Sequence, residues 1–164
     1  MSININNLYL LLYIFYFFLS VAFDLKNKAV PNIIHLIFIV LGIPLFFHIN
    51  ISSDPNITTQ TISDLFFRFL PGLFLLYLSI LSNGALGIGD GIFIIISALF
   101  IPLNCILLIL ISGFLSTFLI SAVILIYGKL CDKDFHRMSL PFIPFMLPGL
   151  YYILMNQPVA GGIL

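Results

Sequence analysis

Long apolar runs separated by short polar segments dominate the sequence and predict membrane-spanning helices. A helix of about 20 residues crosses the apolar core of a bilayer, and the 164-residue chain holds about six such runs. Backbone groups left unpaired in lipid cost several kcal/mol each, so spans of this kind have to be helical. The predicted spans are, approximately, 5–23, 31–49, 64–81, 90–103, 104–127 and 140–155.

Prolines indicate where some of these helices begin or bend. Pro31 is expected in the first turn of the second helix, where its missing N–H would be unpaired in any case. The last span carries Pro141, Pro144 and Pro148, so we expect it to be kinked or partly unwound. The predicted fold class is an all-α polytopic membrane protein, a bundle of about six transmembrane helices in a single domain over residues 1–164.

Composition excludes several other classes of protein. Of the residues, 62% are hydrophobic and 7% charged, whereas soluble domains are about 45–50% apolar and about 25% charged. The formal net charge of 0 argues against a nucleic-acid partner, which requires a basic surface. Cys105 and Cys131 form no disulfide framework or paired-cysteine metal site, and His48 and His136 have no ligands at metal-binding spacing. We therefore expect neither a metal nor a cofactor.

The basic residues predict an orientation in the membrane. Lys and Arg accumulate in short loops on the cytoplasmic side of a membrane. Five of the six basic residues follow the first or the fifth span. An even number of predicted spans separates these two loops, so both lie on the same side of the membrane. If that side is the cytoplasm, the N-terminus lies outside. Arg68, the sixth, is one helical turn after Asp64 and is expected to pair with it. The five cytoplasmic residues are Lys26, Lys28, Lys129, Lys133 and Arg137.

Two aspartates are the candidate functional residues. Asp24 ends the first span and Asp90 begins the fourth, so the predicted topology brings both to the cytoplasmic face. Each has a structural alternative, since Asp24 could pair with Lys26 or Lys28 and Asp90 could cap its helix. However, an ionisable residue facing a bundle is a functional candidate, and two adjacent carboxylates can share acid and base roles around a bound water. This is the chemistry of aspartyl peptide hydrolysis, which needs no metal or cofactor.

Three segments resemble the type IV prepilin peptidases. The first runs from Asp24 to Pro31-Asn32 and resembles the aspartate-to-Pro-Asn signature of that family. Gly87-Ile88-Gly89-Asp90 matches its Gly-x-Gly-Asp motif, after a span with a Pro-Gly pair at Pro71-Gly72. Residues 140–145, Leu-Pro-Phe-Ile-Pro-Phe, resemble the proline-rich opening of the last helix of these peptidases. The order and approximate spacing of all three agree.

The resemblance implies an intramembrane aspartic endopeptidase of the Gly-x-Gly-Asp type. Such an enzyme removes the basic leader from prepilin, pseudopilin or preflagellin precursors at the cytoplasmic face of a prokaryotic inner membrane. By motif match, Asp24 and Asp90 are the catalytic pair, and the supporting positions are Gly87, Gly89, Pro31 and Asn32. The expected partners are the precursor peptide and the lipid bilayer; the sequence predicts no oligomeric state.

The sequence departs from the family pattern at three points. The cytoplasmic insertion with paired cysteine motifs is absent, so the smaller, peptidase-only class fits best. Ile92 stands where the family usually has a lysine, and a cation there would favour ionised carboxylates. The chain has no Glu, which leaves Asp132 and Asp134 as the spare acids of the last cytoplasmic loop. They could bind a basic leader, or could equally pair with the basic residues of the same loop.

Several alternatives remain open at this stage. The missing lysine is compatible with a catalytically impaired scaffold or assembly protein. A small ion-coupled transporter would need a polar path near mid-membrane, but the spans carry only isolated Ser, Thr and His residues. The presenilin branch shares the Gly-x-Gly-Asp motif, yet its Tyr-Asp and Pro-Ala-Leu-Pro motifs are absent. His35 is expected to be a hydrogen-bonded residue of the bundle, with contact to the site as the alternative.

Overall fold

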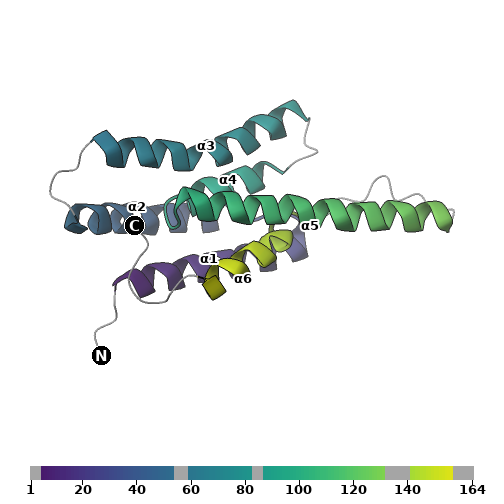
Figure 1. Cartoon of the computed structure of the whole chain (residues 1–164), viewed down its shortest axis with the longest axis horizontal. Coiled ribbons are helices and arrows are strands. Elements are labelled where there is room, and N and C mark those ends of the chain that lie inside the picture. Colours follow the sequence, from purple (N-terminus) through teal and green to yellow (C-terminus); the bar gives the residue numbers. More distant parts are fainter. Residues whose placement is uncertain (1–4, 54–58, 83–86, 132–140, 157–164) are drawn as a thin grey trace.

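The computed structural model describes residues 5–53, 59–82, 87–131 and 141–156 as a helical bundle (Figure 1). Side chains are described for residues 8–48, 63–82, 87–131 and 141–156. Within these segments the structure is helical and contains no strand, which confirms the all-α prediction. The elements are α1 (Ile5–Asn27), α2 (Asn32–Ser53), α3 (Thr59–Leu81), α4 (Ile88–Ser97), α5 (Leu103–Leu130), the 3₁₀-helix η1 (Ile143–Met146) and α6 (Leu147–Asn156).

The lengths of the helices agree with a polytopic membrane protein. Three of the described helices are long and apolar enough to cross a membrane, and shorter apolar helices of 10–17 residues accompany them. Several boundaries differ from the predicted ones: α1 continues to Asn27, α2 to Ser53 and α5 to Leu130, and α3 begins at Thr59 rather than at position 64. The long apolar helices are Leu8–Asn27, Ser63–Leu81 and Leu103–Leu130; the shorter ones are Asn32–His48, Ile88–Ser97 and Ile143–Asn156.

Helix α4 is shorter than the predicted fourth span. It ends at Ser97 after ten residues, so it is about 15 Å long, roughly half of an apolar core of about 30 Å. Residues 98–101 then form a buried turn, and the Tyr9 hydroxyl of α1 donates a hydrogen bond to the Leu99 carbonyl within it. Pro102, the N-cap of α5, explains the break, because proline lacks an N–H and disfavours helical conformation in the residue before it.

The last predicted span does not begin as a regular α-helix, which agrees with the irregularity that its prolines indicated. It begins with the 3₁₀-turn of η1, which has a proline, Pro144, in its first positions. The ten-residue helix α6 follows. The tighter 3₁₀ geometry is common at helix ends, and here it places residues 141–143 at the end of α1 that carries Asp24.

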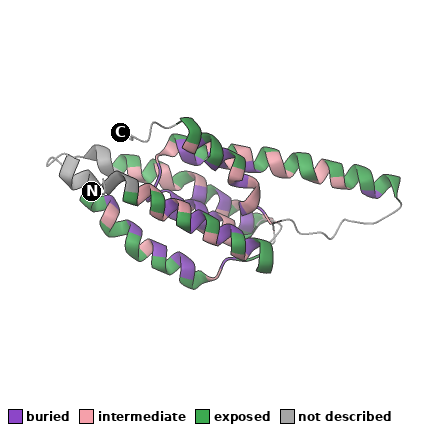
Figure 2. Cartoon of the chain, turned by 90° about the horizontal axis from the view of Figure 1, so that it is seen from below, coloured by how far each residue is buried: buried purple, intermediate pink, exposed green. Residues whose placement is uncertain are grey.

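Aromatic rings of α1 and α4 pack against each other in the interior of the bundle. Phe93 of α4 lies between two rings of α1: Tyr16 stacks on it with centroids 5.2 Å apart, and Phe17 meets it edge-on at 5.5 Å. Pairs of this geometry contribute about 0.5–1.5 kcal/mol beyond the burial of their area. Figure 2 shows buried residues on the inner faces of the helices and exposed residues on the outer faces. Many of those exposed residues are Leu, Ile and Phe, as contact with lipid requires.

Helices α3 and α4 approach so closely that the contact requires glycine on both sides. A Cβ atom on Gly72 would lie 2.8 Å from the backbone nitrogen of Ile95, and one on Gly91 would lie 3.0 Å from that of Leu76. Small residues at such contacts allow helices to associate in lipid. Because Gly91 directly follows Asp90, this contact fixes the position at which α4 begins.

We predict that Gly72→Ala destabilises the protein. The added methyl group would collide with the backbone of α4, and overpacking of this kind costs about 1–3 kcal/mol. Gly42→Ala is the matched control, because the atoms nearest to its Cβ belong to the side chains of Phe100 and Leu99, at 3.0 and 3.2 Å, and not to the backbone of another helix. Thermal unfolding in detergent should show a clearly lower midpoint for Gly72→Ala than for Gly42→Ala. Equal midpoints would contradict the tight α3–α4 contact.

Candidate active site

A left-handed turn at the end of α1 redirects the chain toward α2. Lys28 has a φ of 53°, and its backbone N–H donates to the Asp24 carbonyl at 2.8 Å, which makes it a left-handed helix C-cap. Pro31 precedes α2 rather than lying in its first turn, and its carbonyl accepts the N–H of Ile34 at 3.0 Å. After this reversal Asn32, the first residue of α2, lines the same cavity as Asp24.

Asp90 lies in the first turn of α4 and is held there by Gly87. Gly87 is the N-cap of the helix, and its carbonyl accepts the backbone N–H of Asp90 at 3.1 Å. In return the Asp90 carboxylate accepts a hydrogen bond from the Gly87 backbone N–H, as in a capping box. A Cβ atom on Gly87 would lie 3.0 Å from Asp90 Oδ2, whereas one on Gly89 would meet nothing within 4 Å. The two motif glycines therefore differ: only Gly87 leaves room for the carboxylate.

Asp24 is held by the segment that opens the last helix. Its side chain is buried, with 5% of its surface exposed. The Ile143 backbone N–H donates to Asp24 Oδ2 at 3.1 Å, and the Phe142 N–H also hydrogen-bonds to this carboxylate. Phe142 in turn contacts Phe114 of α5, with ring centroids 5.1 Å apart. The orientation of Asp24 therefore depends on residues more than a hundred positions away in sequence.

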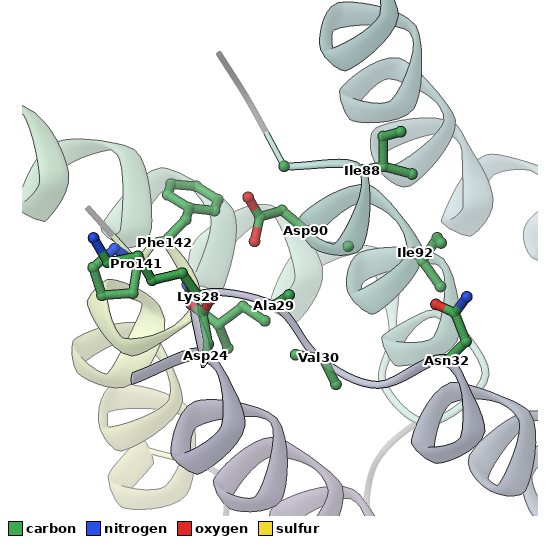
Figure 3. A pocket seen from close by; sticks show the side chains of 13 residues that line it. Asp24, Lys28, Ala29, Val30, Asn32, Ile88, Asp90, Ile92, Pro141 and Phe142 are labelled. Carbon is green, nitrogen blue, oxygen red and sulfur yellow. Dashed lines mark hydrogen bonds between the residues drawn. The ribbon is translucent and has the colours of Figure 1, made fainter. Parts of the chain in front are cut away.

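Both carboxylates border one cavity of about 360 Å³. Figure 3 shows the Asp90 carboxylate directed across this cavity toward Phe142, with the Asp24–Lys28 segment on the opposite wall. The charges of Asp24 and Asp90 act on each other, and largely apolar walls strengthen such an interaction. The lining residues are Asp24, Lys28, Ala29, Val30, Asn32, Gly87, Ile88, Gly89, Asp90, Ile92, Pro141, Phe142 and Ile143.

The structure places most of the predicted site residues around this cavity. Asn32, Gly87 and Gly89 line it together with the two acids, whereas Pro31 does not. His35 also lies outside the lining; it is buried, and its Nδ1 pairs with the Tyr16 hydroxyl at 2.9 Å. Asp132 and Asp134, together with Lys133, His136 and Arg137, lie outside the described residues.

Lys28 is the residue that sequence reasoning did not assign to the site. It served only as a marker of orientation and as a potential partner of Asp24, yet it lines the cavity. Its place inside the Asp24-to-Asn32 motif was the one available signal. Apart from the two aspartates, Lys28 is the only charged residue among the described side chains that line the cavity.

The described side chains include no group of three His, Cys, Asp or Glu residues close enough to hold a metal ion. The described residues that line the cavity contribute two carboxylates and the Asn32 amide as polar side chains besides Lys28. These groups can transfer protons and form hydrogen bonds.

The fold and the cavity define a polytopic helical membrane protein with two acids at one internal site. The sequence matches the model of the type IV leader peptidase family over residues 10–128, and the chain belongs to this family. The matched region includes Asp24 and Asp90 and ends before η1. This confirms the resemblance to the prepilin peptidases and assigns the protein to a family of peptidases. No curated protein and no solved structure matches the chain.

We predict that Asp24→Ala destabilises the protein more than Asp24→Asn. Alanine would leave the buried Ile143 N–H without its acceptor, at a cost of about 1–3 kcal/mol. The asparagine side-chain oxygen can still accept this hydrogen bond. Thermal unfolding of the purified variants should therefore give a midpoint for Asp24→Asn close to that of the wild type and a lower one for Asp24→Ala. A midpoint for Asp24→Ala as high as that of Asp24→Asn would show that this hydrogen bond does not stabilise the fold.

Proposed function

We propose that the protein is an aspartic endopeptidase that removes the leader from prepilin-like precursors, with Asp24 and Asp90 as its catalytic pair. The observation that supports this most directly is that the two acids, from separate helices, border one cavity. Membership of the type IV leader peptidase family supports the substrate class: pilin, pseudopilin or preflagellin precursors.

The chemistry requires one ionised and one protonated carboxylate. Two ionised carboxylates facing one cavity repel each other, so the pair retains a proton that the two side chains share. The ionised group removes a proton from a water molecule as the water oxygen attacks the peptide carbonyl carbon. The protonated group donates its proton to the carbonyl oxygen. The carboxyl group that took the proton from water then donates it to the nitrogen, the C–N bond breaks as the tetrahedral intermediate collapses, and the other carboxylate takes back the proton from the hydroxyl oxygen, so the pair returns to its starting state.

The two motif segments would hold the pair in place for this reaction. Gly87 orients Asp90 through its backbone, and the backbone N–H groups at 142–143 orient Asp24. A peptide has to leave its helical conformation before water can reach its carbonyl carbon. Asn32 lines the cavity and could hydrogen-bond to the exposed backbone of such an extended peptide.

We place this cavity at the cytoplasmic face of a prokaryotic inner membrane. Lys26 lies in the last turn of α1, and Lys129 lies in the last turn of α5. Both helices end toward the same side of the bundle, the right of Figure 1, and basic residues favour the cytoplasmic side. A basic leader in the cytoplasm and an apolar segment in the bilayer would then meet at the level of the two acids.

We predict that Asp24→Asn and Asp90→Asn each abolish leader removal. Loss of a positioned acid or base lowers the rate of such a reaction about 10²–10⁴-fold. The assay is co-expression of the full chain with a panel of prepilins that carry a basic leader, followed by gel separation of precursor and mature forms. Asp64→Asn is the matched control, because Asp64 is exposed on α3 and does not line the cavity.

Two results would contradict the proposal. If either cavity variant processes precursors at the rate of the wild type, that aspartate is not catalytic. If the wild type processes no precursor although it is folded in the membrane, the alternative of a catalytically impaired scaffold or assembly protein gains support. An ion-coupled transporter is distinguished by ion uptake into vesicles that depends on the same two acids.

The two motif glycines should differ in their effect on cleavage. Gly87→Ala would press its methyl group against Asp90 Oδ2 and displace the carboxylate, and misplacement of a catalytic group by about 1 Å can cost about a hundredfold in rate. Gly89→Ala adds a methyl group that meets no neighbour within 4 Å. We predict a substantially larger loss for Gly87→Ala in the same assay. Equal losses would show that the contact with Asp90 is not what makes glycine necessary at position 87.

A further inference from the structure

The described residues that line the cavity include three charged side chains. Asp24 and Asp90 contribute two acidic groups, and Lys28 is the one cation among these described residues. The other lining segments, from α2, from the remainder of α4 and from residues 141–143, present no titratable side chain to the cavity. Lys26, in the last turn of α1, is exposed and does not line it.

The backbone ties Lys28 to one of these acids. Its N–H donates to the carbonyl of Asp24 itself, at 2.8 Å, so the lysine side chain starts one helical turn from the carboxylate. Figure 3 shows Lys28 beside Asp24 on the wall that faces Asp90. Any movement of this part of α1 therefore carries the acid and the cation together.

The conformation of Lys28 is unusual for a lysine. With φ at 53° it occupies the left-handed region, which costs most L-residues roughly 1 kcal/mol and is normally filled by Gly or Asn at a helix C-cap. As a cap alone, position 28 would be served better by either of those residues. A lysine in a backbone conformation that favours Gly or Asn, at a position that lines a cavity, points to a role for the lysine side chain.

We propose that Lys28 is a positioning residue that offsets the charge of the Asp24–Asp90 pair and keeps one of the two carboxylates ionised. Lys28 lines the cavity and is exposed, and apolar residues such as Ile88, Ile92 and Phe142 form much of the wall. An opposite charge near a carboxylate favours its ionised form. Position 92, an isoleucine that lines the same cavity, offers a second place from which a cation could do this.

The test is an infrared titration of the purified full-length protein, which does not depend on cleavage. A protonated carboxyl group has a carbonyl stretch that disappears on ionisation, and Asp24→Asn and Asp90→Asn assign the bands of the pair. The informative variant is Lys28→Asn, because asparagine tolerates the left-handed backbone and removes the charge. Lys26→Asn is the matched control for loss of a positive charge from the same end of α1.

We expect Lys28→Asn to raise the pH at which the carboxyl bands disappear by about 0.5–1 pH unit, because Lys28 is exposed and solvent screens part of its field. Lys28→Arg and Lys26→Asn should leave this pH close to that of the wild type. Ile92→Lys added to Lys28→Asn should return the midpoint toward the wild-type value. Thermal unfolding of each variant verifies that the fold is intact.

The proposal would be overturned if the carboxyl bands of Lys28→Asn and Lys26→Asn had the same titration midpoint. It would also be overturned if Lys28→Arg, which keeps the positive charge, shifted this midpoint as much as Lys28→Asn does. The consequence for catalysis rests on the proposed function: the acidic limb of the pH–rate profile should move upward by the same amount in Lys28→Asn. The two ideas remain separable. If Lys28→Asn shifts the infrared midpoint but the wild type cuts no prepilin, the role of Lys28 is supported and the peptidase proposal is rejected. If the wild type cuts prepilins but Lys28→Asn shifts no midpoint, the peptidase proposal is supported and the role of Lys28 is rejected.

Discussion

The hydrogen bond from the Ile143 backbone N–H to Asp24 Oδ2 joins the last helical segment to the first. A buried acid in a lipid-embedded bundle is unfavourable unless its oxygen atoms find donors. The donors here come from η1 and the residue before it, where the 3₁₀ geometry replaces a regular α-helical turn. The prolines that loosen this segment are therefore part of how the acid is accommodated, since they leave N–H groups at 142–143 directed at α1.

The second acid is positioned by a different set of contacts. Asp90 depends on the first turn of α4, and α4 is fixed by its glycine contact with α3 and by the aromatic packing of Phe93 against α1. The cavity consequently lies where two groups of elements meet, α1 with η1 on one side and α3 with α4 on the other.

Sequence patterns predict the helical class and the end of α1, because polarity changes sharply at Asp24–Lys28 and the apolar runs have bilayer length. They do not predict the end of α4, since residues 98–101 are as apolar as the helix before them and only Pro102 marks the turn. The contact between Asp24 and residues 142–143 was equally hidden. Hydrogen bonds between segments so far apart depend on packing, and no local pattern encodes them. Lys28 was overlooked because a basic residue after a span has a sufficient explanation in membrane orientation.

The short α4 also explains how Asp90 can be held firmly in place. A full-length span could slide or tilt along its axis, whereas α4 ends after ten residues in a buried turn that is hydrogen-bonded to Tyr9 of α1. The Tyr9 ring also packs against Phe100 of that turn, with centroids 5.2 Å apart. Anchoring the C-terminal end of a short rigid helix limits the movement of its N-terminal end, where Asp90 lies. Helix α1, which carries Asp24, therefore also holds the C-terminal end of α4, which carries Asp90. This shared anchor links the positions of the two acids.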